Sequence, residues 1–227
     1  MIEFKDVSKS YKNGKLALFN INLKIDKGEF VFLVGSSGAG KSTFIKSLLK
    51  EEDITSGKIL VHGKDIGKIP KRKVPKYRRS IGIVFQDFRL LPNKTVYENV
   101  AFAMEIIGQN SKNIRRRVPF VLGMVGLSEK AKSYPSELSG GEQQRVSIAR
   151  AIVNNPSIII ADEPTGNLDP QTSNEIMNII TDINRRGTTI IMATHASDLV
   201  DRMKKRVIAL KKGIVIKDEE RGSYSYE

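Results

Sequence analysis

The run of glycines and small polar residues at positions 35–43 constrains this chain more than any other feature. It consists of Gly35, Ser36, Ser37, Gly38, Ala39, Gly40, Lys41, Ser42 and Thr43. This order matches the phosphate-loop pattern, in which a glycine, four free positions and a second glycine precede lysine and serine or threonine. The apolar residues 30–34 before it predict a buried strand, and residues 43–50 after it have apolar side chains at helical spacing. A strand, a loop and a helix in this order are the context that the pattern requires.

The residue types of this loop predict its chemistry. Glycines let the backbone wrap a phosphate so that its N–H groups point inward, and the positive end of the following helix adds to the attraction. We expect Lys41 to contact the outer phosphates and Ser42 to reach a magnesium ion. A flexible turn of glycine and serine is the alternative, but such a turn does not call for a lysine at this spacing.

Further along the chain, strands and helices are expected to alternate. Residues 158–161 and 188–193 are two more candidates for buried strands, and the helix between them has a stripe of isoleucines at positions 176, 179, 180 and 183. Alternation of this kind predicts an α/β fold with a parallel sheet. The functional edge of such a sheet lies at the carboxyl ends of its strands.

Three regions depart from that alternation. Residues 1–29 and about 55–66 contain short alternating segments, which predict a small antiparallel sheet. Residues from about 88 to 150 have mainly helical patterns, with Val118, Val121, Leu122 and Val125 on one face, and predict an inserted helical subdomain. Residues 207–216 predict a hairpin. With 227 residues, 40% of them hydrophobic, we expect the whole chain 1–227 to form one domain.

Composition narrows the classes of protein. The absence of cysteine excludes disulfides and thiolate metal sites, and no apolar stretch approaches the 18 residues of a membrane span, so we expect a soluble, non-exported chain. The formal net charge of +13 suggests a polyanionic partner. The excess lies in short clusters at positions 71–79, 115–117 and 202–206. Each is either a solvated face or a contact with anionic lipid of the inner leaflet.

Two further motifs complete a catalytic set. Strand 158–161 would deliver Asp162 and Glu163 to the sheet edge, where one carboxylate can hold the magnesium shell and the next can polarise water. A helix start before Pro164 is the alternative.

The run that begins Leu138, Ser139, Gly140, Gly141, Glu142 opens a helix and predicts a second anion-binding nest. A two-fold dimer, in which each nest closes over the other protomer's nucleotide, would use both loops. A merely structural glycine turn is again the alternative.

In this order, and together with Gln86, the segment 166–169 and His195, these motifs resemble the ATP-binding-cassette (ABC) ATPases over essentially the whole chain. The resemblance implies a P-loop NTPase with a RecA-like core, a small antiparallel β-subdomain and an inserted helical subdomain. It also implies ATP and Mg²⁺ as ligands, hydrolysis to ADP and phosphate, and a homodimer in the ATP-bound state.

The resemblance assigns four further roles. Gln86 would contact the magnesium ion or the attacking water, and His195 would touch the γ-phosphate. Asp169 would lie in a loop that communicates across the dimer, although it also fits the N-cap of a helix that begins at Pro170. Tyr11 would stack on adenine, unless it is simply an aromatic residue of a strand. Ser36 departs from the family, because many relatives have proline there.

Segments 79–91 and 95–101 most closely resemble the cell-division branch of this family. That branch implies an FtsX-like integral membrane partner on the cytoplasmic face of the cell membrane at the division septum, and a signal to peptidoglycan hydrolases rather than transport. The ATPase of a lipoprotein-releasing or macrolide-export transporter is the nearest alternative. No nucleic-acid partner is expected, since the chain lacks a long heptad segment, zinc-binding cysteines and a second cassette. A scaffold that binds ATP without turnover would not need Glu163 and His195.

Overall fold

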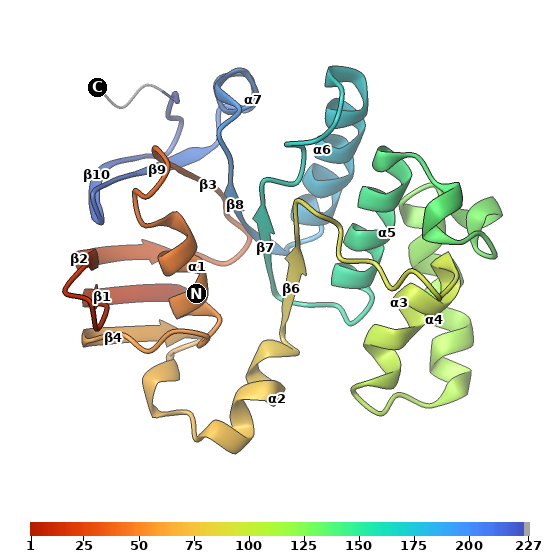
Figure 1. Cartoon of the computed structure of the whole chain (residues 1–227), viewed down its shortest axis with the longest axis horizontal. Coiled ribbons are helices and arrows are strands. Elements are labelled where there is room, and N and C mark those ends of the chain that lie inside the picture. Colours follow the sequence, from red (N-terminus) through yellow and green to blue (C-terminus); the bar gives the residue numbers. More distant parts are fainter. Residues whose placement is uncertain (225–227) are drawn as a thin grey trace. The chain divides into compact units, whose positions relative to one another are not determined.

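The computed structural model describes residues 1–224, and its backbone divides into two compact units (Figure 1). The first, here called the terminal unit, contains residues 1–78 and the residues from 189 on; the second, the middle unit, contains residues 79–188. That the two units together form one cassette domain remains a prediction.

The terminal unit carries most of the strands. Its elements are β1 (Ile2–Ser10), β2 (Leu16–Ile25), β3 (Phe30–Val34), α1 (Lys41–Leu48), β4 (Ser56–Val61), β5 (Lys64–Asp65), α2 (Val74–Arg78), β8 (Thr189–Ala193), α7 (Ser197–Met203), β9 (Arg206–Lys211) and β10 (Ile214–Glu219), with short 3₁₀ turns at Ile66–Lys68 and Lys71–Lys73. The expected strands 30–34 and 188–193 and the expected helix 43–50 are therefore present, within two residues at each end.

Strand β3 is the centre of the terminal unit, and all five of its residues are buried. It pairs in parallel with β8 on one side and with β9 on the other, so that Val31 lies opposite both Ile191 and Arg206. A run without polar alternation suits such a strand, because both of its faces are covered. The predicted hairpin is confirmed: β10 is antiparallel to β9, and Lys212 and Gly213 turn the chain with positive φ angles.

The predicted antiparallel sheet is also confirmed. Its strand order is β2-β1-β4-β5, and every pairing in it is antiparallel. Figure 1 shows β2, β1 and β4 side by side. Phe4 of β1 stacks on Phe44 of α1 with a centroid distance of 4.3 Å, and both side chains are fully buried. This contact packs the helix that follows the glycine loop against the antiparallel sheet.

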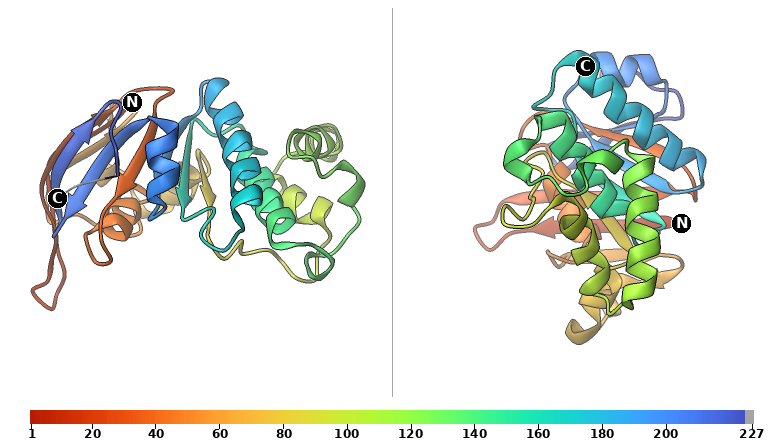
Figure 2. Two further views of the ribbon diagram at one scale, coloured as in Figure 1. Left: turned by 90° about the horizontal axis from the view of Figure 1, so that it is seen from above. Right: turned by 90° about the vertical axis from the view of Figure 1, so that its right-hand side faces the viewer.

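The middle unit is mainly helical. Its elements are β6 (Ile81–Val84), α3 (Val96–Glu105), α4 (Ser111–Met124), α5 (Gly140–Ile152), β7 (Ile158–Asp162) and α6 (Pro170–Arg185), with 3₁₀ turns at Ser128–Lys130 and Pro135–Glu137. Strands β6 and β7 pair in parallel, and both views of Figure 2 show α3 and α4 packed together beside α5. Helices thus occupy the region 88–150, as predicted.

Helix faces in the middle unit follow the predicted periodicity with one exception. The expected face of α4, which includes Val118 and Leu122, is fully buried. On α6, Ile176, Ile180 and Ile183 are buried, but Ile179 is only partly buried and Met177 is buried in its place. At 3.6 residues per turn, positions 176, 179, 180 and 183 span about 100° of the helix and positions 176, 177, 180 and 183 about 120°. Periodicity therefore does not favour Met177 over Ile179, and only the packing of the folded chain selects it.

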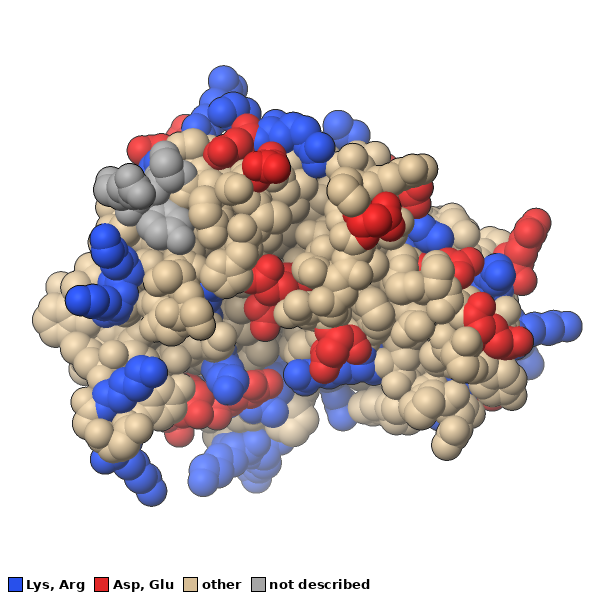
Figure 3. All heavy atoms as spheres, turned by 45° about the horizontal axis from the view of Figure 1, so that its top comes forward, with Lys and Arg blue, Asp and Glu red and all other residues tan. Residues whose placement is uncertain are grey.

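Basic side chains stand in separate groups on the face shown in Figure 3, with acidic side chains between some of them. Each predicted cluster also contains an arginine that the fold itself uses. Arg78 donates to the carbonyl oxygens of Leu49 and Lys50, and Arg117 donates to that of Val153. Arg206 donates to Asp218 of β10 and to Glu29. Only part of the positive charge is therefore free for an external partner.

In the part of the chain that the structure describes, no helix is both long enough and apolar enough to cross a bilayer.

Candidate functional site

The glycine loop of the terminal unit joins the end of β3 to the start of α1. Gly35 has a φ of +149°, and a Cβ at this position would lie 2.3 Å from the carbonyl oxygen of Leu210, so a side chain does not fit. Gly40 caps α1 with a left-handed φ of 113°, and no side chain among the described residues caps this helix. The start of α1, with a glycine as its cap, suits the anion that the sequence predicts here.

Lys41 folds back along this loop. Its Nζ donates to the carbonyl oxygen of Gly35 at 2.6 Å and to that of Ser36 at 3.3 Å. The ammonium group is thereby held within the turn of the loop. This position suits a contact with the outer phosphates of a nucleotide.

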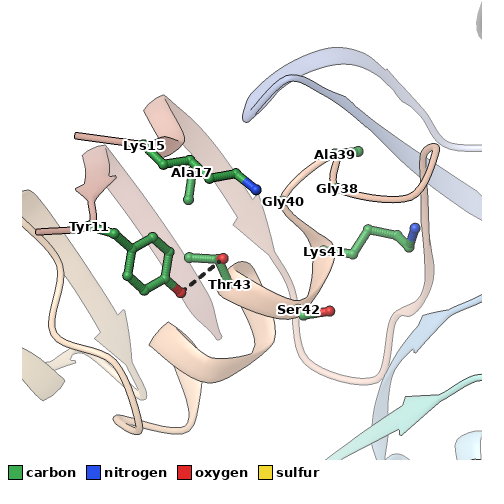
Figure 4. Close-up of a pocket in the computed structure, with 9 residues that line it drawn as sticks. All are labelled: Tyr11, Lys15, Ala17, Gly38, Ala39, Gly40, Lys41, Ser42 and Thr43. Carbon is green, nitrogen blue, oxygen red and sulfur yellow. Dashed lines mark hydrogen bonds between the residues drawn. The ribbon is translucent and has the colours of Figure 1, made fainter. Parts of the chain in front are cut away.

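A hollow of about 120 Å³ lies beside the loop, and Figure 4 shows its walls. Its lining consists of Tyr11, Lys15, Ala17, Gly38, Ala39, Gly40, Lys41, Ser42 and Thr43. The hydroxyl of Tyr11 lies 3.3 Å from Oγ1 of Thr43, so the ring is fixed at the edge of the hollow. Sequence reasoning missed Lys15, which no motif marks. Stacking of Tyr11 on adenine remains a prediction.

His195 follows strand β8 and reaches the same loop. Its Nε2 lies 3.1 Å from Nζ of Lys41, and its Nδ1 lies 3.5 Å from the hydroxyl of Tyr224. The structure thus brings Lys41, which is expected at the outer phosphates, next to His195, to which the resemblance assigns the γ-phosphate. Tyr224 has no motif around it and was not foreseen.

In the middle unit, the acidic pair stands where β7 ends. Asp162 is the last residue of the strand, and Glu163 begins a tight turn with a φ of +50°. The N–H of Gly166 donates to the carbonyl oxygen of Glu163 at 3.1 Å and closes this turn. The alternative of a helix start at Pro164 is wrong, because the next helix, α6, begins only at Pro170.

Gln86 lies against the same turn. It follows strand β6, and its Nε2 donates to Oδ1 of Asn167 at 3.3 Å. A Cβ at Gly166 would lie 3.0 Å from that Nε2 atom, so a larger residue at 166 would crowd the amide. Gln86 and the turn after Glu163 therefore lie next to each other.

The second glycine run opens α5 as predicted. Ser139 is the N-cap: its hydroxyl accepts from the N–H of Glu142 at 3.2 Å, while Glu142 accepts from the N–H of Ser139 at 2.8 Å. This backbone hydrogen bond holds the pKa of Glu142 below its usual value, against the opposing effect of burial. Gly141 packs on α6, since a Cβ there would lie 2.3 Å from Cγ2 of Thr172. This glycine is thus structural, whatever else the run binds.

Asp169 has the N-cap role that the sequence predicted. Its Oδ1 accepts from the N–H of Thr172 at 3.0 Å, and Pro170 is the first residue of α6. Hydrogen bonding with Thr172 lowers the pKa of Asp169. Its role across a dimer remains a prediction.

Two polar side chains of α5, the buried Gln144 and the partly buried Arg150, support these turns and were not foreseen. Gln144 is fully buried, and its Nε2 donates to the carbonyl oxygen of Pro164, directly after Glu163, at 2.6 Å. Arg150 donates to the carbonyl oxygens of Phe88 and Arg89 at 2.7 and 2.5 Å. Phe88 and Arg89 both have positive φ angles, so Arg150 stabilises a strained segment just after Gln86.

The predicted metal ligands offer oxygen atoms only. They are the hydroxyl of Ser42, the amide of Gln86 and the carboxylate of Asp162. Among the described residues, no group of three or more histidine, cysteine or carboxylate side chains is placed to hold a metal. One carboxylate, neutral oxygens and substrate phosphates fit Mg²⁺, which is usually bound in this way rather than in an all-protein cage.

The chain is similar to known proteins over most of its length. The family model described as "ABC transporter" matches residues 18–166. The chain is 58% identical over 228 residues to the cell division ATP-binding protein FtsE of Bacillus subtilis, and the alignment covers all of both chains. It is 57% identical over 227 residues to the FtsE of Streptococcus pneumoniae serotype 2, and this alignment covers all of the chain and 99% of the relative.

Among solved structures, the dimeric post-hydrolysis state of the ATP-binding cassette MJ0796 bound to ADP and Pi is similar. Its TM-score is 0.86 at 37% identity, covering 98% of this chain and 100% of the other.

Proposed function

Since the chain belongs to the family of ABC transporter ATPases, we propose that it is the ATP-hydrolysing subunit of a bacterial cell-division complex of the FtsE and FtsX type. The contact that supports ATP hydrolysis best is the 3.1 Å approach of Lys41 to His195, at a loop whose N–H groups suit a phosphate. Full-length identity of 57–58% to cell-division ATP-binding proteins supports the cellular role.

In this proposal, the terminal unit binds the nucleotide. Tyr11 stacks on the adenine at the edge of the hollow, and the N–H groups of positions 35–43 surround the β- and γ-phosphates. Lys41 turns from the carbonyl oxygens of its own loop toward the phosphates, which are stronger acceptors because they are charged. His195 donates to the γ-phosphate.

The middle unit supplies the groups that act on water. Glu163 is the general base that orients and deprotonates the attacking water, and the hydrogen-bonded turn between Glu163 and Gly166 fixes its backbone. Ser42, Gln86 and Asp162 would hold Mg²⁺. When bound, the ion would neutralise charge on the phosphate oxygens.

We further propose that ATP joins two copies of the chain. The N-terminus of α5, with Ser139, Gly140 and Gly141, would approach the γ-phosphate of the partner's nucleotide, and Asp169 would lie near the two-fold axis. The dimeric cassette structures among the similar proteins support this arrangement. Binding energy of ATP would then drive closure, and hydrolysis would reverse it.

The proposed partner is an FtsX-like integral membrane protein, with the chain on the cytoplasmic face of the membrane at the division septum. A conformational signal would pass through this partner to peptidoglycan hydrolases. Basic side chains of positions 71–79, apart from those that the fold occupies, would favour anionic headgroups by about 1 kcal/mol each close to the surface.

Two measurements test the proposal. Steady-state phosphate release by the purified chain with ATP and Mg²⁺ tests the activity, and its absence, also with the membrane partner present, would refute the ATPase assignment. Co-purification from membranes of the source cell tests the role. Recovery of a lipoprotein-releasing or macrolide-export permease in place of an FtsX-like protein would replace the cell-division assignment with transport.

A further inference from the structure

The segment after β10 returns to the site and is fixed there. The N–H of Gly222 donates to the carbonyl oxygen of Lys205 at 3.2 Å, and the N–H of Tyr224 donates to Oδ1 of Asp201 at 2.6 Å. A Cβ at Gly222 would lie 2.7 Å from Cβ of Val207, so the glycine lets the segment pass close to β9. These contacts hold the backbone of Tyr224 beside helix α7.

This placement brings a tyrosine hydroxyl to the far side of the histidine ring. The hydroxyl oxygen of Tyr224 lies 3.5 Å from Nδ1 of His195, while Nζ of Lys41 lies 3.1 Å from Nε2 of the same ring. The contact with Tyr224 is long, but hydrogen bonds around catalytic groups often shorten only when substrate binds. His195 thus has one ring nitrogen toward the phosphate loop and one toward Tyr224.

The protons of these groups depend on each other. A lysine ammonium group only donates, so the contact with Lys41 requires Nε2 of His195 to accept, and in the neutral ring the proton then lies on Nδ1. The oxygen of Tyr224 accepts from that N–H. A phosphate oxygen, in contrast, only accepts. In the neutral ring, contact with a γ-phosphate therefore needs the proton on Nε2, and Nδ1 becomes an acceptor.

A tyrosine hydroxyl suits both tautomers, because it both donates and accepts. We propose that Tyr224 is the positioning residue of His195. Its hydroxyl accepts from Nδ1–H while Nε2 faces Lys41. When Nε2–H turns to the phosphate, the same hydroxyl donates to Nδ1. The inference rests on the proposed ATPase function. It adds a residue that acts through His195 and does not touch the nucleotide.

The first test is kinetic and uses the full chain. Tyr224→Phe keeps the ring and removes the hydroxyl. We expect kcat to fall about three- to ten-fold, because one neutral hydrogen bond is lost near the transition state. KM for ATP should stay within about two-fold of the wild-type value. Tyr134→Phe, the same change at an exposed tyrosine, should keep wild-type kcat.

A second pair of variants tests the hydrogen bond that anchors the segment to Asp201. Asp201→Ala frees the segment and should lower kcat as Tyr224→Phe does. Asp201→Asn keeps an acceptor oxygen and should keep most of the activity.

The second test observes the ring itself. The chain has two histidines, so the spectrum of ¹⁵N-histidine-labelled protein contains only His195 and, as an internal control, His62. With a non-hydrolysable ATP analogue and Mg²⁺, the wild type should show the Nε2–H tautomer of His195, and Tyr224→Phe should show a mixture of both tautomers. The signals of His62 should not change.

The outcomes separate the two proposals. If the wild type releases no phosphate, also with the membrane partner present, the ATPase assignment fails, and the nitrogen spectra still test the contact of Tyr224 with His195. If the wild type is active but Tyr224→Phe has the same kcat, or the same His195 signals, the role of Tyr224 is refuted. An equal loss in Tyr134→Phe would also refute it.

Discussion

Nζ of Lys41 and Nε2 of His195 lie 3.1 Å apart, although 154 positions separate the two residues in the chain. The contact places the cation of the phosphate loop and the histidine after β8 at one point of the terminal unit. In the proposed function, both residues would meet the phosphates of the same nucleotide.

Lys41→Ala should weaken ATP binding by at least about ten-fold, because the phosphates lose a charged donor. Equilibrium titration with a fluorescent ATP analogue would measure the effect. Lys46→Ala, on the exposed face of the same helix, is the matched control and should bind as the wild type does. Equal affinity of both variants would contradict the phosphate-loop assignment.

Glu163→Gln should slow hydrolysis by about 10² to 10⁴ fold and leave ATP binding intact, since the amide cannot act as a general base. Single-turnover hydrolysis and nucleotide titration together measure the two effects. Glu129→Gln, at an exposed position of the middle unit, provides the control. Turnover at the wild-type rate in Glu163→Gln would remove this carboxylate from the mechanism.

Arg150→Met should lower the free energy of unfolding by about 2–3 kcal/mol, because the carbonyl oxygens of Phe88 and Arg89 lose a charged donor. Arg150→Lys should recover only part of this loss, since an ammonium group cannot reproduce the fork of a guanidinium. Urea denaturation measures both variants. The exposed Arg185 offers a comparison, and its change to methionine should cost less than about 0.5 kcal/mol. A loss in Arg150→Met that is no larger than the loss at Arg185 would show that the segment after Gln86 does not depend on Arg150.

Glu142→Gln tests the pH dependence of the cap on α5. The pKa of Glu142 is lower in the folded protein than its ordinary value of about 4.3. Its carboxylate therefore stabilises the fold above that ordinary value, and the stabilisation disappears as the pH falls through the folded pKa. Because the group is partly exposed and glutamine also fits a capping box, we expect a difference of only about 0.5 kcal/mol at pH 7. Chemical denaturation from pH 7 down to acid pH should show this difference vanish; Glu105→Gln, at an exposed helix end, should show no such trend.

Much of the fold could be predicted because its signals are local. The five buried residues of β3, the turn at Gly213 and the caps at Ser139 and Asp169 each depend on side chains within a few positions. Periodicity also located α6, although it placed Ile179 rather than Met177 in the buried stripe. Positions 176 and 177 are adjacent, and a count of isoleucines alone overlooks a methionine on the same face.

The support of the site could not be predicted in the same way. Gln144, Arg150 and Tyr224 act through backbone carbonyls or a ring nitrogen of segments 20 to 62 positions away. A backbone carbonyl has no residue identity, so its partner leaves no recurrent spacing in the sequence. Only the folded chain shows why a glutamine or an arginine stands at these positions.

The tip of the β9–β10 hairpin is more than a surface turn. The N–H of Gly213 donates to the carbonyl oxygen of Ala39 in the glycine loop at 2.9 Å, and its own carbonyl oxygen accepts from the N–H of Phe19 at 2.8 Å. Hairpin tips usually tolerate inserted peptides and permutation of the chain ends. Here an epitope or reporter spliced at Gly213 would pull on Ala39 and on β2 at once, so labels for imaging this protein in cells belong elsewhere.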